Sequence, residues 1–408
     1  MDRFELNNEK KFSLAMLLMT VVMVLGTGTL SVEGMNADAF ALNYRHGLIP
    51  RGFMGFILDM FCSVFGERFY TYATVFVICS IGFIIYLAVM WQFGKKLIVS
   101  LGNTDHARAF VMVIAPFFIA MFLGYENYGR TDMYLLALSL TAGYAVIKQK
   151  ALILSVICPL IAILIHEGYV LTFFNIVVAC FLYKIFTTKG KIRTTNIIFL
   201  IISVLTVGAA FIWFFFLSRK VIPLTTDIYL DTISRAEILT SPEGYTHYDF
   251  LNMILTGFET YDSEETMRSL AMTEMPLFIV LFLPVFKVCI DFVRKVYSFS
   301  SRKMLVVVLC LGSVTLLPEF ARKCDVGRWM FAFITYYVIL TVLLLIDGNK
   351  VVRKVFDDMI NGIAKSSWKG IFFALYIMLF VPFQTFFVSS ISFNILEFMR
   401  SLFYGDLF

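Results

Sequence analysis

The stretch from Asn196 to Leu217 reads NIIFLIISVLTVGAAFIWFFFL and carries no charged side chain. It is long enough for a helix that crosses about 30 Å of hydrocarbon, which takes about 20 residues. Because no water reaches that layer, the backbone groups of such a run must bond within the segment, as they do in an α-helix. The run also lacks the strict alternation that is typical of a barrel strand. It therefore predicts a membrane-spanning helix.

Runs of this kind recur along the whole chain. Hydrophobic residues make up 60% of the 408 residues and charged residues only 15%, which is more apolar surface than a soluble domain can bury. We therefore predict an all-α integral membrane protein, a single polytopic domain over residues 1–408 with about eleven spans. The predicted spans are 12–30, 70–93, 108–124, 132–147, 151–165, 168–186, 196–217, 276–293, 304–318, 329–346 and 369–391.

Several classes of protein are disfavoured by what the sequence lacks. The net charge of +5 is not accompanied by a basic groove with interleaved aromatic residues, so we expect no nucleic-acid partner. The seven cysteines form no CxxC pair, and most fall inside predicted spans, as small buried apolar residues do. No Walker motif, no GxGxxG that opens a helix and no Ser-His-Asp signature is present.

Lysine and arginine fall unevenly on the two sides of the predicted membrane. With eleven spans, one set of loops collects most of them, and the other set holds fewer over longer loops. Positive residues favour the cytoplasmic side, so we expect a cytoplasmic N-terminus and an outer C-terminal tail. The basic set includes Lys10, Lys11, Lys95, Lys96, Lys148, Lys150, Lys189, Lys191, Lys350 and Lys354.

Two outer loops are long enough to hold structure of their own. In the first, 31–69, the half that follows Pro50 is apolar enough for an interfacial helix. The second, 218–275, is locally acidic and carries aromatic residues such as Tyr248 and Phe250, which favour short interfacial or lid helices. A plain solvated loop is the alternative for the second.

The first of four polar segments on the outer side carries Arg45, His46 and Arg51 beside Gly47 and Gly52. Glycine lets a backbone approach a ligand, and the planar fork of arginine matches phosphate oxygens. The segment therefore predicts contact with a phosphate-bearing ligand. Arginines that anchor to lipid headgroups are the alternative.

The second segment carries Glu126, Arg130 and Asp132. On a helix, Glu126 and Arg130 would share a face and pair, which is the structural alternative to a role in binding. Gly129 weakens a helix at this point, so a turn is also expected.

The third segment, His166-Glu167-Gly168, separates two short apolar runs. Glu167 has almost no charged neighbour in the sequence, and apolar surroundings raise the pKa of a carboxyl group toward values useful for a general base or acid. A hydrogen-bonded helix end is the alternative.

The fourth segment carries Arg322, Asp325 and Arg328 at intervals of three, followed by Trp329. If helical, the three would share a face, with Asp325 orienting both arginines. A structural salt-bridge cluster is the alternative. The four segments share the outer side, where helix packing can bring them together, and no basic loop offers a comparable set.

These motifs together resemble bacterial membrane proteins of surface-polysaccharide synthesis. The residues that carry the resemblance are the glycine-flanked basic segment (Tyr44 to Gly52), Gly-Arg-Thr-Asp (Gly129 to Asp132), the His166-Glu167 pair and Asp-x-Gly-Arg-Trp (Asp325 to Trp329). The families are polyprenyl-phosphate-dependent GT-C-type glycosyltransferases and oligosaccharide repeat-unit polymerases. Two family patterns are missing: Arg235 is not followed by glycine eleven residues later, and the histidine-centred signature of O-antigen ligases is absent.

The resemblance implies roles for individual residues. In GT-C enzymes an acidic residue of the first outer loop serves as base or metal ligand, and Asp38 occupies that region. Outer arginines hold the lipid diphosphate in the related polymerases. The expected catalytic residues are Asp38, Asp132, His166 and Glu167, and the expected binding residues are Arg45, His46, Arg51, Glu126, Arg130, Arg322, Asp325 and Arg328.

The function expected from the resemblance is transfer of a sugar or glycan from an undecaprenyl-phosphate-linked donor, at the outer face of the bacterial inner membrane, in capsule or O-antigen synthesis. The partners would be the polyprenyl-linked oligosaccharide, membrane lipid and other polysaccharide-assembly proteins. A divalent cation is compatible with that chemistry, but no ligand spacing for one is visible. A transporter or flippase of lipid-linked sugars, and a non-catalytic assembly partner, remain the alternatives.

Overall fold

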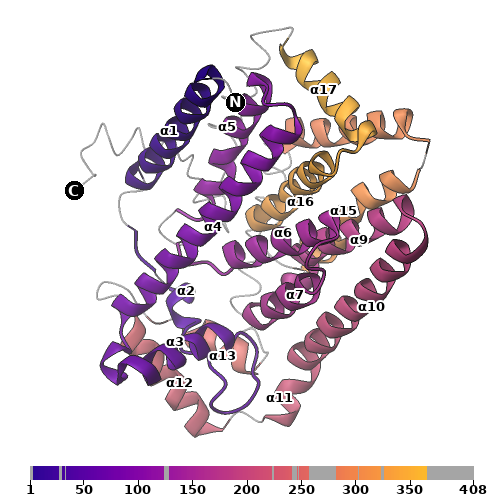
Figure 1. Cartoon of the computed structure of the whole chain (residues 1–408). Coiled ribbons are helices and arrows are strands. Elements are labelled where there is room, and N and C mark those ends of the chain that lie inside the picture. Colours follow the sequence, from indigo (N-terminus) through magenta and orange to yellow (C-terminus); the bar gives the residue numbers. More distant parts are fainter. Residues whose placement is uncertain are drawn as a thin grey trace.

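The uncharged stretch at 196–217 forms α10 (Gly190–Ile212), as expected. The helix continues through a π-helical turn, η2 (Trp213–Leu217), into α11 (Ser218–Val221). The computed structural model describes residues 3–26, 30–32, 34–123, 128–222, 225–240, 246, 248–256, 282–301, 303–322 and 326–364. Within these ranges the chain is helical and contains no strand (Figure 1).

Most of the other predicted spans are also helices. They are α1 (Arg3–Gly26), α4 (Tyr72–Ser100), α5 (Asp105–Ala120), α6 (Asp132–Lys148), α7 (Leu154–Ile165), α8 (Tyr169–Thr172), α9 (Phe174–Thr187), a helix over 282–299, α15 (Met304–Arg322) and α16 (Val326–Ile346). Among the described residues, three helices are long and apolar enough to cross a membrane: Tyr72–Ser100, Gly190–Leu217 and Arg328–Ile346. The predicted span at 369–391 lies outside the described residues. The chain is therefore a helical protein with the properties of a membrane protein, while the number of spans remains a prediction.

Threonine side chains mark the starts of three helices. Thr71, Thr104 and Thr225 each accept a hydrogen bond from the backbone N–H three residues on, at the first turns of α4, α5 and α12 (Thr226–Leu239). Such a cap satisfies one of the donors that a helix leaves open at its N-terminus.

Helix α6 lies in the middle of the bundle. It packs against α7, α9, α4 and α16, and its apolar residues are almost all buried (Figure 1). By contrast, α10 packs mainly against α7 and α9 and leaves Ile198, Ile201 and Leu205 exposed. An exposed row of aliphatic side chains on a long apolar helix is expected where a helix faces lipid.

The two long loops assigned to the outer side both contain helices. The first forms α2 (Met35–Asp38), α3 (Phe53–Phe65) and a 3-10 turn, η1 (Glu67–Phe69). The second forms α12 and α13 (Tyr248–Thr256). Helices α2, α3, α12 and α13 gather at one end of the bundle (Figure 1). Helices are thus present in both loops, as predicted, while their position at the membrane interface remains a prediction.

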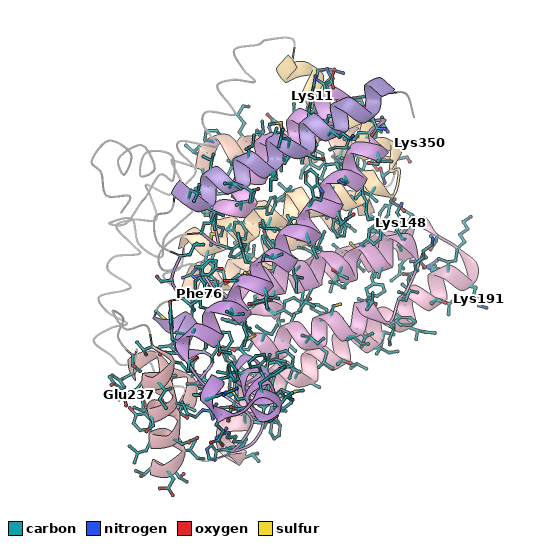
Figure 2. All side chains as sticks on the ribbon, turned by 60° about the vertical axis from the view of Figure 1, so that its left-hand side comes forward. Lys11, Phe76, Lys148, Lys191, Glu237 and Lys350 are labelled. Carbon is teal, nitrogen blue, oxygen red and sulfur yellow. The ribbon has the colours of Figure 1, made fainter. Side chains whose placement is uncertain are left out.

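The residues assigned to opposite sides of the membrane lie at opposite ends of the molecule. Lys11, Lys148, Lys191 and Lys350 lie toward one end, and Glu237 of α12 lies at the other (Figure 2). The basic end also holds a buried ion pair, with Lys184 Nζ 2.7 Å from Asp347 Oδ1, and the helix α17 (Lys350–Ala364).

Candidate functional site

Where the helices meet the outer loops, a buried polar cluster joins all four predicted segments. Its first element is a bidentate ion pair between Arg51, just before α3, and Glu167, in the turn between α7 and α8. Arg51 Nε lies 3.0 Å from Glu167 Oε1, and Arg51 Nη2 lies 2.7 Å from the same oxygen. The two side chains are only 14% and 15% exposed. The guanidinium also lies 5.6 Å from the ring centre of Phe250 of α13, which covers it.

The second element joins α16 to α6. Arg328, in the first turn of α16, donates from Nε to Asp132 Oδ1 at 2.9 Å, and Asp132 is the first residue of α6. The Asp132 side chain is 3% exposed and that of Arg328 is 13% exposed. Arg130 is also buried and lies close enough to interact electrostatically with Asp132. Two arginines therefore act on one carboxylate.

His166 links the two elements. It ends α7 in an extended conformation, and its Nδ1 lies 3.9 Å from Glu167 Oε2. Its Nε2 lies 3.4 Å from Arg328 Nη2. Arg51, Glu167, His166, Arg328, Asp132 and Arg130 thus form one group, which we name the arginine cluster.

The environment of Glu167 is the reverse of the one expected. Burial acts to raise the pKa of Glu167, but Arg51, with a smaller contribution from His166, holds that pKa well below its usual range. The prediction of a raised pKa is therefore wrong, because the sequence neighbours of Glu167 are apolar but its spatial neighbour is a guanidinium. Burial, aided by Arg51 and Arg328, lowers the pKa of His166 to about 3, so its imidazole is neutral at physiological pH.

The backbone at Arg51 is in the left-handed region, with φ at 59°. A residue with a Cβ pays about 1–2 kcal/mol for that conformation, so a non-glycine residue there needs a compensating contact. The Arg51–Glu167 ion pair supplies that contact. Gly129, with φ at 85°, makes the turn expected before α6, so Arg130 is not on a helix.

Arg45 and His46 do not join the arginine cluster. Arg45 is 56% exposed and pairs with Asp59 of α3 at 3.1 Å, while His46 Nε2 lies 3.0 Å from Asp231 of α12. Asp59 also accepts from Arg235 at 2.8 Å, and Arg235 donates from Nε to the carbonyl of Ala41. These contacts fasten α12 to the first outer loop.

Asp59, the partner of Arg45 and Arg235, is not among the residues predicted from the sequence to form a site. The sequence does offer one indication that Asp59 has a partner: it is the one acidic residue within the apolar run Phe53 to Phe65. A carboxylate in such a run is expected to be paired.

Asp38 lies at the end of α2 and is 1% exposed. On the same short helix, Asn36 donates to the carbonyl of Tyr128, two residues before Arg130, at 3.2 Å. Helix α2 therefore touches the segment that leads into the arginine cluster, and it also packs against α12.

Three predicted site residues remain. Two of them, Glu126 and Asp325, lie outside the described residues. Arg322 is the last residue of α15, and α16 begins at Val326. Arg322 and Arg328 are thus on different helices, so the condition for a common face, one helix through all three residues, is not met. In the described part of the chain, no group of three His, Cys, Asp or Glu residues could hold a metal ion.

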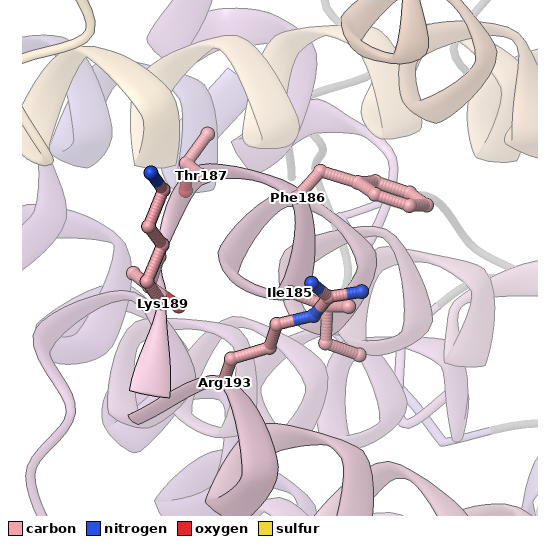
Figure 3. A pocket seen from close by; sticks show the side chains of 6 residues that line it. Ile185, Phe186, Thr187, Lys189 and Arg193 are labelled. Atoms are coloured by element: carbon pink, nitrogen blue, oxygen red, sulfur yellow. The ribbon is translucent and has the colours of Figure 1, made fainter. Parts of the chain in front are cut away.

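A small hollow lies at the basic end, between the C-terminus of α9 and the start of α10 (Figure 3). It is lined by Ile185, Phe186, Thr187, Thr188, Lys189 and Arg193. The two cations belong to a loop assigned to the cytoplasmic side, so this hollow is separate from the arginine cluster.

Comparison of the chain with models of protein families, with curated proteins and with solved structures finds no match.

Proposed function

We propose that this chain is a membrane glycosyltransferase or oligosaccharide repeat-unit polymerase of bacterial surface-polysaccharide synthesis. It would use a polyprenyl-phosphate-linked donor at the outer face of the inner membrane, with about eleven spans and a GT-C-like or polymerase-like arrangement. The observation that carries the proposal is the arginine cluster. In it, Arg51, Arg130 and Arg328 from three distant segments lie close together, next to the helices of the two long loops.

The chemistry of the cluster suits a lipid phosphate. A guanidinium offers parallel N–H donors that match phosphate oxygens, and burial strengthens each interaction relative to water. When a glycosidic carrier bond breaks, negative charge develops on the leaving phosphate. Donors already fixed in place stabilise that charge without reorganising. Glu167 and Asp132 keep the guanidinium groups of Arg51 and Arg328 oriented before the substrate binds.

The acceptor hydroxyl also needs a base. Glu167 and Asp132 are each engaged by a guanidinium, which weakens them as bases. Asp38, buried on the helix that touches the Arg130 segment, remains the residue we assign to this role. No step in this scheme requires a nucleotide, because the carrier phosphate activates the sugar.

The test is a transfer assay on the purified full-length chain in liposomes that contain a lipid-linked oligosaccharide. New glycosidic bonds are expected with the unaltered protein. Arg51→Lys and Arg328→Lys each keep the positive charge but lose the parallel N–H donors of the guanidinium group. Product formation should therefore fall at least tenfold.

A matched control separates function from folding. Lys184→Met also breaks a buried ion pair, but at the basic end, so it should lower stability while leaving the transfer rate of the folded protein unchanged. If no donor gives product and the lipid carrier instead moves across the bilayer, the chain is a flippase and the transferase proposal is refuted. Full activity in both arginine variants would remove the arginine cluster from the mechanism.

A further inference from the structure

The contacts of His166 are unusual for a buried imidazole. The backbone N–H of Gly168 donates to its Nδ1 at 2.9 Å. The other ring nitrogen, Nε2, faces Arg328 Nη2 at 3.4 Å, and the residue as a whole is 8% exposed. A guanidinium nitrogen has hydrogens to donate and no lone pair to accept one.

The backbone contact fixes the position of the imidazole hydrogen. A neutral imidazole carries one hydrogen, and the nitrogen without it is the acceptor. Because Nδ1 accepts from Gly168, the hydrogen is on Nε2. The opposite tautomer would set two hydrogens against each other across 2.9 Å. Gly168 makes the approach feasible, since a Cβ at that position would lie only 2.9 Å from His166 Cε1.

Two donors therefore face each other across 3.4 Å, where neither can bond to the other. A single oxygen beside the pair, at the third corner of a triangle with the two nitrogens, can lie at the ordinary hydrogen-bond distance of about 2.8–3.0 Å from both. We propose that His166 Nε2–H and Arg328 Nη2–H form a two-donor site for one phosphate oxygen of the lipid-linked substrate. This inference rests on the proposed function for the identity of the substrate but not for the geometry of the site.

The consequence for His166 is a change of role. An imidazole whose Nε2 already carries a hydrogen cannot remove a proton through that atom, so His166 is a binding residue and not the general base. Its surroundings keep it neutral: Arg51 and Arg328 oppose a second proton, Glu167 and Asp132 favour one, and burial decides in favour of the neutral ring.

The first test uses the unaltered chain and needs no variant. In protein labelled with ¹⁵N at histidine, the ring nitrogens of His166 report the tautomer directly, with His166→Gln used to assign the signals. The expected result is hydrogen on Nε2 only, between pH 5 and pH 8, and a shift of the Nε2 signal when inorganic pyrophosphate is added. Hydrogen on Nδ1, or on both nitrogens, at pH 7 would overturn the proposal.

The second test measures pyrophosphate binding by titration calorimetry on the detergent-solubilised full chain. Loss of a charge-assisted hydrogen bond in His166→Ala should weaken binding about tenfold or more. His166→Gln keeps an N–H donor and should recover much of the affinity. His106→Gln, at an exposed position of α5, is the matched control and should bind like the unaltered protein.

The two proposals fail separately. Equal pyrophosphate affinity in His166→Ala, alongside glycosidic product from the unaltered chain, would refute the two-donor site and keep the transferase. His166-dependent binding of pyrophosphate without any product would keep the site and refute transfer.

Discussion

At the scale of the residue, the protonation state of His166 affects the stability of the folded chain. The pKa of His166 is about 3 in the folded chain, against an ordinary value of 6.5. Between these values the unfolded chain binds a proton that the folded chain does not, so the free energy of unfolding falls as pH decreases below 6.5. The slope contributed by one such group approaches about 1.4 kcal/mol per pH unit.

We predict that lowering the pH from 7 to 5 destabilises the purified protein, and that His166→Gln flattens this dependence. The window excludes Glu167, whose carboxyl contributes only below its ordinary pKa of 4.5. The measurement is denaturant or thermal unfolding at several pH values. His106→Gln, at an exposed position of α5, should keep the slope of the unaltered chain. An unchanged slope in His166→Gln would show that His166 is not buried in its neutral form.

The sequence predicted which residues were chemically interesting but not what they contact. His166, Glu167, Arg130, Asp132, Arg51 and Arg328 could be found because ionisable side chains beside apolar runs are costly unless paired or functional. Their partners lie far away in the chain: Arg51 and Glu167 are 116 residues apart, and Arg328 and Asp132 are 196 apart. The pKa of a side chain depends on such neighbours, so its direction could not be derived from adjacent residues.

At the scale of the element, α3 is fixed to the preceding loop by direct backbone contact. A Cβ on Gly55 would lie 1.9 Å from the carbonyl oxygen of Leu42 and 2.6 Å from that of Phe40. Backbone cannot give way as a side chain can, so α3 and the loop approach this closely only because residue 55 is glycine.

We predict that Gly55→Ala lowers the free energy of unfolding by about 1–3 kcal/mol, the usual cost of overpacking. Gly208→Ala is the matched control. It lies inside α10 with nothing within 4 Å of the added Cβ, so it should be neutral or slightly stabilising. Both are measured by thermal unfolding in the same detergent. Equal melting temperatures would mean that α3 does not pack on Leu42.

Asp59 is the carboxylate that pairs with the buried Arg235 of α12. It lies 2.8 Å from Arg235 and 3.1 Å from Arg45, and the Arg235 guanidinium also lies 4.7 Å from the centre of the Tyr70 ring. Asp59→Asn removes the charge and leaves the buried Arg235 without its full counterion, a change that costs several kcal/mol locally.

We expect faster amide hydrogen exchange across α12 in Asp59→Asn, because local opening becomes more frequent. Asp105→Asn, which breaks the exposed pair with Arg108 in α5, should leave exchange in α12 as it was. Unchanged exchange in Asp59→Asn would indicate that apolar contacts alone hold the helix.

Helix positions were more predictable than helix junctions. The apolar runs lie close to the observed helices because length and hydropathy alone specify them. The predicted spans 304–318 and 329–346 left a break near Arg322, but the exact junction could not be derived, because charges at intervals of three fit a helical face whether or not the helix is interrupted.

At the scale of the whole molecule, lysines from several different loops lie toward the same end. Lys11, Lys148, Lys191 and Lys350 lie toward one end and Glu237 toward the other (Figure 2). The positive end is expected in the cytoplasm. The sequence predicted that the loops of these lysines share one side, since that depends only on the order of spans along the chain; which side faces the cytoplasm remains a prediction.

We predict opposite labelling of two single-cysteine variants, Lys191→Cys and Glu237→Cys, in an otherwise cysteine-free chain. In cells whose outer membrane has been removed but whose inner membrane is intact, a membrane-impermeant thiol reagent should label the cysteine of Glu237→Cys and not that of Lys191→Cys. Labelling of both only after lysis, or of the first alone, would contradict the proposed orientation.

The π-helical turn at Trp213–Leu217 has a consequence for how this chain tolerates change in length. Such a turn holds one residue more than an α-helical turn, and here the Trp213 indole donates to the carbonyl of Leu48 at 2.8 Å. Removing one residue from it would restore a uniform α-helix and leave the downstream segment at nearly its present angle, because the wider turn already holds the extra residue; a deletion elsewhere in α10 would rotate that segment by about 100°. The turn is therefore the place in this helix where a one-residue deletion is expected to change the direction of the following loop least.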